Sequence, residues 1–221
     1  MVRETVRSGF NGIYEPAQMA KYLFATSDFH VSSHHIINWV RAGLTLAELS
    51  EIPSRQLLLT FDDLITFRMI VIFRKAGFSL RHIIKVERYF QTVTGEPRPF
   101  ATKRFWIGTR DLFSELYGRL VSGSKGGQQA FDFIRSSLKE VELTFNEQGI
   151  ASRWLVRPHV SLQPMIQFGE PCIDGTRIPT GTVWGMFKAG DSEPFLARCF
   201  KVRPQEISEA IAWERKLEEV A

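Results

Sequence analysis

The chain has 221 residues, of which 44% are hydrophobic, so it can form one large domain or two to three small ones and is too apolar for general disorder. No uncharged apolar run approaches the roughly 18 residues of a membrane span. The first residues also lack the apolar stretch of a signal peptide, and a cytoplasmic protein that does not enter a membrane is the expectation.

The net charge of +4 is distributed unevenly along the chain. Residues 1–94 carry 11 Lys/Arg and 8 Asp/Glu, net +3, residues 95–160 carry 10 and 7, net +3, and residues 161–221 carry 7 and 9, net −2. A basic N-terminal part and an acidic C-terminal part are consistent with a protein that binds DNA at one end and another partner at the other. Cys172 and Cys199 lie far apart without Cys or His at metal-ligand spacing, so we expect buried thiols and no metal or cofactor.

Residues 1–94 are predicted to form a mainly helical DNA-binding domain. We expect helices at 14–23, 31–44, 62–75 and 79–90, and a short strand at 57–61. Ser32 or Ser33, Asp62 and Ser79 stand where N-caps are needed, since their side chains can accept from free backbone N–H groups. This order is the layout of a winged helix-turn-helix, whose second helix enters the major groove.

The second predicted helix has an apolar and a polar side. Ile36, Ile37, Trp39 and Val40 form the first, whereas His34, Asn38 and Arg41 fall together at i, i+4 and i+7. Asn pairs bidentately with adenine and Arg with guanine. An ordinary solvated helix face is the alternative. The predicted DNA-contacting residues are Ser33, His34, His35, Asn38 and Arg41, with Arg55 at the wing tip formed by residues 52–56.

The front of the chain also resembles a known family. Tyr14, Ala17-Gln-Met-Ala20 and Trp39-Val-Arg-Ala-Gly-Leu44, followed by Leu64, Arg74-Lys-Ala-Gly-Phe-Ser-Leu80 and Ile83, resemble the MerR-type winged helix over about the first two-fifths of the chain. The link between the first two helices looks longer than in that family. The long dimerisation helix and the cysteine metal loop are missing, so metal sensing and promoter untwisting are not implied.

Residues 95–160 are expected to be a mixed α/β segment. Gly95-Glu-Pro-Arg-Pro99 ends the helical zone because two prolines in three residues cannot continue a helix. Strands are predicted at 105–107 and 141–145, and a turn at 146–149 leads the second of these into residues 150–156 as a hairpin. Five aromatic residues of this segment are expected to pack in the core or, alternatively, to line a ligand pocket. They are Phe100, Phe105, Trp106, Phe113 and Tyr117.

Residues 161–221 are predicted to begin with a short β entry and to continue as helices near 180–189, 192–200 and 203–220. Phe195, Leu196, Cys199 and Phe200 are expected to bury one face of the second of these helices, and Ile207, Ala210, Ile211, Trp213 and Leu217 one face of the last. Arg177 is expected to be buried and paired with Asp174 or Glu170, or alternatively to contact a protein partner or a phosphate.

The string Phe168-Gly-Glu-Pro-Cys-Ile-Asp-Gly-Thr-Arg-Ile-Pro-Thr180, with Trp184 and Ala189-Gly-Asp-Ser192, resembles the small C-terminal domain of VapB-type antitoxins. The resemblance runs from about 164 to 218, and it implies a PIN-like ribonuclease toxin as the partner. Arg177, Glu206, Glu209 and Glu214 are the candidate toxin contacts, although the glutamates are also typical of a solvated face.

No catalytic set is evident, since the chain has neither a P-loop nor a Gly-x-Ser-x-Gly elbow, and Asp62-Asp63 are better explained by capping. The sequence therefore predicts a non-enzymatic α+β protein. Its expected function is an antitoxin that binds a ribonuclease toxin and represses its own promoter as a homodimer on double-stranded operator DNA. The alternatives are a stand-alone MerR-like regulator with a ligand-binding middle domain, and an interaction scaffold with a vestigial DNA-binding domain.

Overall fold

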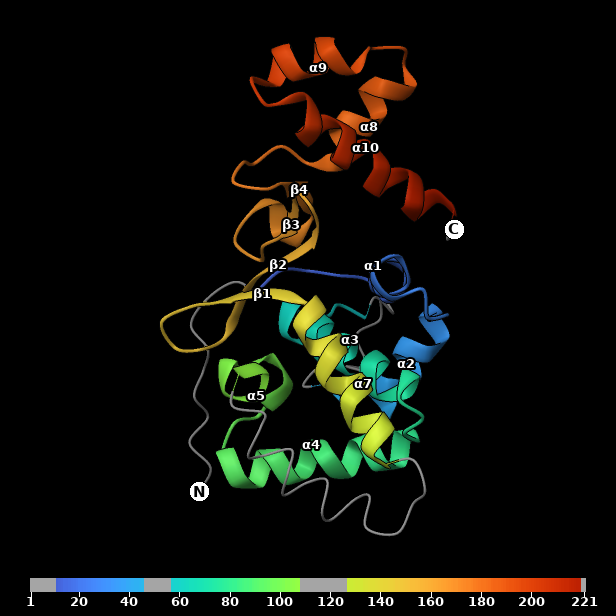
Figure 1. Cartoon of the computed structure of the whole chain (residues 1–221), viewed down its shortest axis with the longest axis vertical. Helices are drawn as coiled ribbons and strands as arrows, with labels where there is room; N and C mark the ends of the chain where they lie inside the picture. Colours follow the sequence, from blue (N-terminus) through green and yellow to red (C-terminus); the bar gives the residue numbers. More distant parts are fainter. Residues whose placement is uncertain (1–10, 46–56, 108–126, 220–221) are drawn as a thin grey trace.

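The computed structural model describes residues 11–45, 57–107 and 127–219, and it has an α+β fold. Figure 1 shows a helical front unit (α1 to α5 and α7) at one end, a small sheet in the middle and a rear unit (α8 to α10) at the other end. Within the described ranges, none of the helices has both the length and the apolar character that a membrane span requires.

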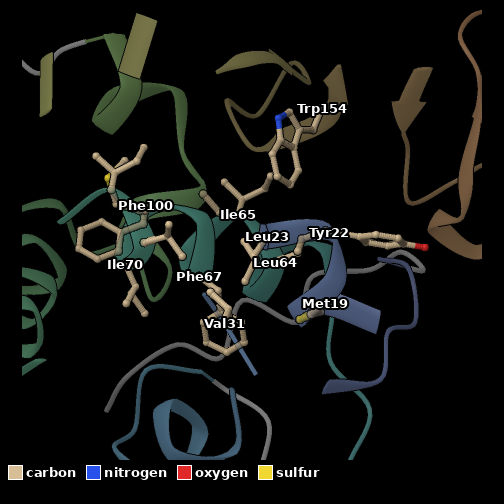
Figure 2. Packing of buried hydrophobic residues seen from close by; sticks show 14 of the residues in the cluster. Met19, Tyr22, Leu23, Val31, Leu64, Ile65, Phe67, Ile70, Phe100 and Trp154 are labelled. Atoms are coloured by element: carbon tan, nitrogen blue, oxygen red, sulfur yellow. The ribbon is translucent and has the colours of Figure 1, made fainter. Parts of the chain in front are cut away.

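The front unit is built around one buried helix. Its first four helices are α1 (Pro16–Ser27), α2 (Ser33–Arg41), α3 (Phe61–Lys75) and α4 (Leu80–Thr94). Every residue of α3 from Phe61 to Phe73 is buried. Figure 2 shows the α3 side chains Leu64 and Ile65 close to Leu23 of α1, with Trp154 next to Ile65. Apolar residues all round a helix are typical of a central position in a core.

Two of the three predicted N-caps are confirmed. Ser32 caps α2 and Ser79 caps α4, each accepting from a backbone N–H three residues on. The prediction for α3 is wrong, because Thr60 is the cap and Asp62 is already the second residue of the helix. Thr60 accepts from the Asp63 N–H, and the Asp63 carboxylate accepts from the Thr60 N–H at 2.9 Å. This capping box satisfies two free donors at once.

Two strand predictions are wrong in the structure. Residues 57–61 form a single antiparallel bridge, Tyr14 with Leu59, because Phe61 already begins α3. Residues 105–107 belong to the short helix α5 (Lys103–Ile107), which follows the 3₁₀ turn η1 (Pro99–Ala101). Phe105 is buried against Phe90 and Phe100, with ring centroids 4.9 and 4.8 Å apart, so packing overrides the local strand preference.

The helix α7 (Gly127–Glu140) leads into a four-stranded antiparallel sheet in the order β1-β2-β3-β4. Its strands are β1 (Glu142–Phe145), β2 (Ala151–Arg157), β3 (Val160–Leu162) and β4 (Pro171–Ile173). The predicted hairpin is confirmed, and Asn146 Oδ1 accepts from the backbone N–H groups of Gln148 and Ile150 in its turn. Because β3 pairs with both β2 and β4, the sheet spans the expected boundary between residues 160 and 161.

The rear unit has the three predicted helices, α8 (Thr180–Lys188), α9 (Glu193–Phe200) and α10 (Pro204–Glu219). They enclose a second, smaller core whose buried members are Ile173, Val183, Leu196, Ala197, Ile207, Ala210 and Ile211. The prediction that Phe195 and Cys199 are buried is wrong, since both are exposed. Leu196 and Ala197 face the core of this unit instead, and the side of α9 that carries Phe195 and Cys199 is turned outward.

Residues that follow β3 in the chain contact the front unit near both ends of α1. At the first end, the Tyr14 hydroxyl donates to the carbonyl of Gly169, in the turn η2 (Gln167–Gly169), at 3.0 Å. At the other end, Lys216 Nζ of α10 lies 3.1 Å from Asp28 Oδ1. Between them Trp213 of α10 packs against Tyr22, with ring centroids 6.0 Å apart. Trp213 is therefore part of the front core, although it lies in the rear unit.

Candidate nucleic-acid interface

The scaffold of the candidate interface is the pair α1 and α2 with the turn at 28–32. Asp28 ends α1 in the left-handed conformation, with φ of +51°. Two cations of α3 then bind the last carbonyls of α1: Arg68 Nη2 lies 3.5 Å from the Thr26 oxygen, and Lys75 Nζ lies 2.8 Å from the Ser27 oxygen. Cations are favourable at a helix C-terminus, so these contacts fix the turn to the central helix.

The inner side of α2 anchors this helix in the core. Ile36, Trp39 and Val40 are buried, and the Trp39 ring lies 5.4 Å from that of Phe67 in α3. Leu44 is also buried, after Gly43 has turned the chain with a φ of +78°. The apolar side was predicted from helical spacing, and three of its four members are buried, with Ile37 half-buried.

The outer side of α2 presents the predicted polar set to solvent. Ser33, His34 and Arg41 are exposed, and Asn38 is half-buried. Their spacing along a regular helix places His34, Asn38 and Arg41 in one row on that side. Donors and acceptors of this kind on a rigid, outward helix face have the chemistry to contact base edges or phosphates. Arg55 lies outside the described residues.

His35 is exposed, and its ring also takes part in the N-terminal cap of α2. Its Nδ1 accepts from the Ser32 backbone N–H at 3.1 Å and lies 3.0 Å from Ser32 Oγ, which completes a capping box at the start of α2. The usual sequence signal for this box is Glu or Gln at that position, so a histidine there does not reveal it. His35 therefore positions the helix that carries the other candidate residues.

A buried ionic cluster holds the chain just after α2. Thr45 Oγ1 donates to Asp63 Oδ1 at 2.6 Å, and Arg98 lies between two carboxylates. Its Nε is 3.6 Å from Asp63 Oδ1, and its Nη1 is 3.3 Å from Glu87 Oε1. Burial raises the pKa of Glu87 to about 7, although the Arg98 guanidinium opposes this shift. Sequence reasoning missed the cluster because its members come from four separate segments.

The three glutamates among the candidate toxin contacts each have a hydrogen-bond or ion-pair partner within the chain. Glu209 pairs with Arg157 of β2, and Glu206 pairs with Arg203 at 2.9 Å. The Glu214 carboxylate accepts from the Thr180 hydroxyl, and burial raises its pKa. These three glutamates thus hold partners within the chain. Within the described ranges, no group of three His, Cys, Asp or Glu residues could hold a metal ion.

The prediction of a buried Arg177 paired with Asp174 or Glu170 is wrong. Asp174 receives two hydrogen bonds from Arg153 of β2, at 2.8 and 2.6 Å, and this contact lowers the pKa of the Asp174 carboxyl. Arg177 is exposed, and its carbonyl accepts from Gln167 Nε2 at 3.0 Å. The chain turns at residues 174–175, where Gly175 has a φ of +75°. Arg153 can supply the partner because β2 lies two strands from β4, a relation that no local spacing reveals.

Comparisons with known proteins concern the rear unit and the fold. Residues 160–213, from β3 to α10, match the family described as a protein of unknown function, DUF433. No curated protein matches the chain. The chain is similar to the X-ray crystal structure of Rv2018 from Mycobacterium tuberculosis, with 18% identity and a TM-score of 0.72. The similarity covers 90% of this chain and 96% of that chain, and at this identity it shows that the two share a fold.

Proposed function

We propose that the protein is a non-enzymatic antitoxin that binds operator DNA through α2 and a PIN-like ribonuclease toxin through its rear unit. It acts as a homodimer on operator half-sites, as helix-turn-helix proteins commonly do. The observation that carries the proposal is the outward polar face of α2 on a buried helix-turn-helix scaffold.

The DNA-binding part of the proposal rests on chemistry and on rigidity. Asn38 and Arg41 have the functional groups that read adenine and guanine in the major groove. Their helix is capped by Ser32 and anchored by the buried Trp39, so both side chains start from a fixed backbone. A preorganised backbone lowers the entropic cost of binding. His34 and Ser33, at the first turn of α2, are suited to phosphate oxygens.

The toxin-binding part rests on the sequence resemblance of the rear unit to antitoxin C-terminal domains. Since Glu206, Glu209 and Glu214 have partners within the chain, we assign them to the stability of the rear unit. Arg177 is the better candidate contact, because its side chain is exposed. A guanidinium can pair bidentately with a carboxylate, and a toxin with a carboxylate metal site offers such groups.

The alternative of a ligand-binding middle domain receives less support. Phe100 and Phe105 are buried and in contact with each other, with ring centroids 4.8 Å apart. The Trp106 indole donates to the Phe100 carbonyl at 2.6 Å. These residues act as core, and Phe113 and Tyr117 lie outside the described residues.

Substitution of the α2 face tests the DNA-binding part. Asn38→Ala and Arg41→Ala should each weaken binding to the promoter fragment of the protein's own gene by about 1–3 kcal/mol, which is the usual worth of one bidentate pairing with a base. Gel-shift titration at fixed salt measures this affinity. Arg215→Ala, an exposed arginine on α10, is the matched control and should bind like the parent. Parental affinity in both α2 variants would contradict the assignment.

Co-expression with the product of an adjacent nuclease gene tests the toxin-binding part. The parent should co-purify with that nuclease and restore growth of cells that express it. Arg177→Glu should abolish both effects yet keep the parental DNA affinity, because a reversed charge repels carboxylates. Failure of the parent to bind or to rescue would overturn the antitoxin proposal.

A further inference from the structure

We propose that α4 carries a second surface for duplex DNA, which binds the phosphate backbone through Arg81, Lys85 and Arg88. We call these three residues the α4 basic face. The inference rests on the proposed function, because it assumes that the protein binds duplex DNA, and it adds a contact surface that α2 does not include.

The three cations form a regular row. Arg81, Lys85 and Arg88 are all exposed, and they stand at i, i+4 and i+7 of α4, so they share one side of the helix. At 1.5 Å per residue, the row spans about 10 Å. His82, which is also exposed, lies beside its first member.

No carboxylate of α4 offsets these charges. Glu87 is the single acidic residue between Leu64 and Gly95. It is only 2% exposed and pairs with Arg98 at 3.3 Å, inside the protein. An ordinary solvated helix face usually mixes the two signs of charge. A surface of one sign produces a field that attracts a polyanion.

The α4 basic face begins a short connection away from the turn that precedes α2. Lys75, at the end of α3, donates to the Ser27 carbonyl at the end of α1. The connection from α3 to α4 therefore starts beside the turn that precedes α2, and Arg81 follows at the beginning of α4. Figure 1 shows α4 at the end of the front unit that is farthest from the rear unit. A partner bound to the rear unit would leave this surface accessible.

The chemistry of the row favours phosphate over an acidic protein. Cores of protein interfaces are depleted in Lys and are built on aromatic anchors. Arg and Lys, in contrast, are common partners of phosphate oxygens, and such contacts position a duplex without reading its sequence. Such contacts release counterions, so their number can be read from the salt dependence of binding.

The test is the salt dependence of binding to a mixed-sequence DNA duplex, measured by fluorescence anisotropy. In the triple variant Arg81→Ala, Lys85→Ala and Arg88→Ala, the slope of log K against log salt should become shallower by about 2.7, at roughly 0.9 per phosphate contact. The matched control replaces Lys139, Arg198 and Arg215 with Ala, which removes the same charge from exposed helical positions elsewhere. The control should keep the parental slope. If the triple variant does not fold, the single variant Lys85→Gln replaces it, and the slope should then become shallower by about 0.9.

The outcomes separate this inference from the proposed function. If Asn38→Ala and Arg41→Ala abolish the preference for the promoter while the α4 triple variant keeps the parental slope, the α4 inference is overturned and the proposed function stands. The same conclusion follows if the triple variant keeps its slope but no longer co-purifies with the nuclease, since the face then serves a protein. A parent that binds no duplex overturns both proposals.

Discussion

At the scale of single residues, the stability of the fold is sensitive to changes in the buried cluster of Asp63, Glu87 and Arg98. Glu87 and Arg98 are each 2% exposed, so their charged groups have lost most of their hydration. A buried ion pair often contributes little net stability, but removal of one partner is costly because the other charge stays buried. The cluster also receives Thr45, which follows α2, so its integrity affects the exit of the candidate recognition helix.

Arg98→Met should lower the free energy of unfolding by about 3–5 kcal/mol at pH 8, since Asp63 and Glu87 would be left without their shared cation. Urea denaturation followed by circular dichroism measures this change. Arg104→Met, which alters an exposed arginine of α5, should stay within about 0.5 kcal/mol of the parent. Equal stability of both variants would show that the cluster does not carry the predicted charges.

Glu87→Gln should change the pH dependence of stability. The pKa of Glu87 is raised from 4.5 to about 7 in the folded protein, so the folded state binds more protons than the unfolded state between these values. The contribution of the Glu87 carboxyl to the free energy of unfolding is therefore present at low pH and is lost as the pH rises through about 7. Denaturation curves across this range should fall less steeply with pH in Glu87→Gln than in the parent. An identical pH profile would contradict the raised pKa.

At the scale of elements, the sequence predicted what local chemistry determines. The helices α1 to α4 and α8 to α10 have spaced apolar residues, and several have recognisable caps, so their existence could be inferred. The outward face of α2 follows from the same periodicity. Residues 105–107 could not be predicted, because Phe90 and Phe100 decide their conformation. The Arg153–Asp174 contact and the ionic cluster join distant segments, so no spacing reveals them.

The contact between η2 and Tyr14 can be tested with two glycines that both require a left-handed backbone. Gly169 has a φ of +93° and Gly175 a φ of +75°, so alanine strains both positions by about 1–2 kcal/mol. A Cβ on Gly169 would also lie 2.7 Å from Cζ of the buried Tyr14 ring, whereas a Cβ on Gly175 meets nothing within 4 Å. Gly169→Ala should therefore be less stable than Gly175→Ala by a further ~1–3 kcal/mol in urea denaturation. Equal destabilisation of the two variants would mean that Tyr14 moves aside freely.

At the scale of the whole molecule, the helices α1 to α4 are not an independent domain. Their core includes Phe100, Ile134 and Trp154 from the middle of the chain and Trp213 from α10. The rear unit has its own smaller core, but α10 also contributes to the front one. A fragment that ends after Thr94 would expose the apolar surface that these side chains cover, and about 25 cal/mol of stabilisation disappears for each Å² uncovered.

Trp213 is the point where this dependence can be measured. Trp213→Ala should cost about 3–5 kcal/mol, because the ring is 1% exposed and packs against Tyr22. Its indole Nε1 has no hydrogen-bond partner among the described residues, so Trp213→Phe removes volume without breaking a hydrogen bond and should cost about 1–2 kcal/mol. Hydrogen exchange should report faster opening of α1 in Trp213→Ala, although the substitution lies in the rear unit, since α1 and α10 share this contact. If exchange in α1 stayed at the parental rate while α10 opened, the two units would be independent, and a partner bound at the rear could not influence the outward face of α2.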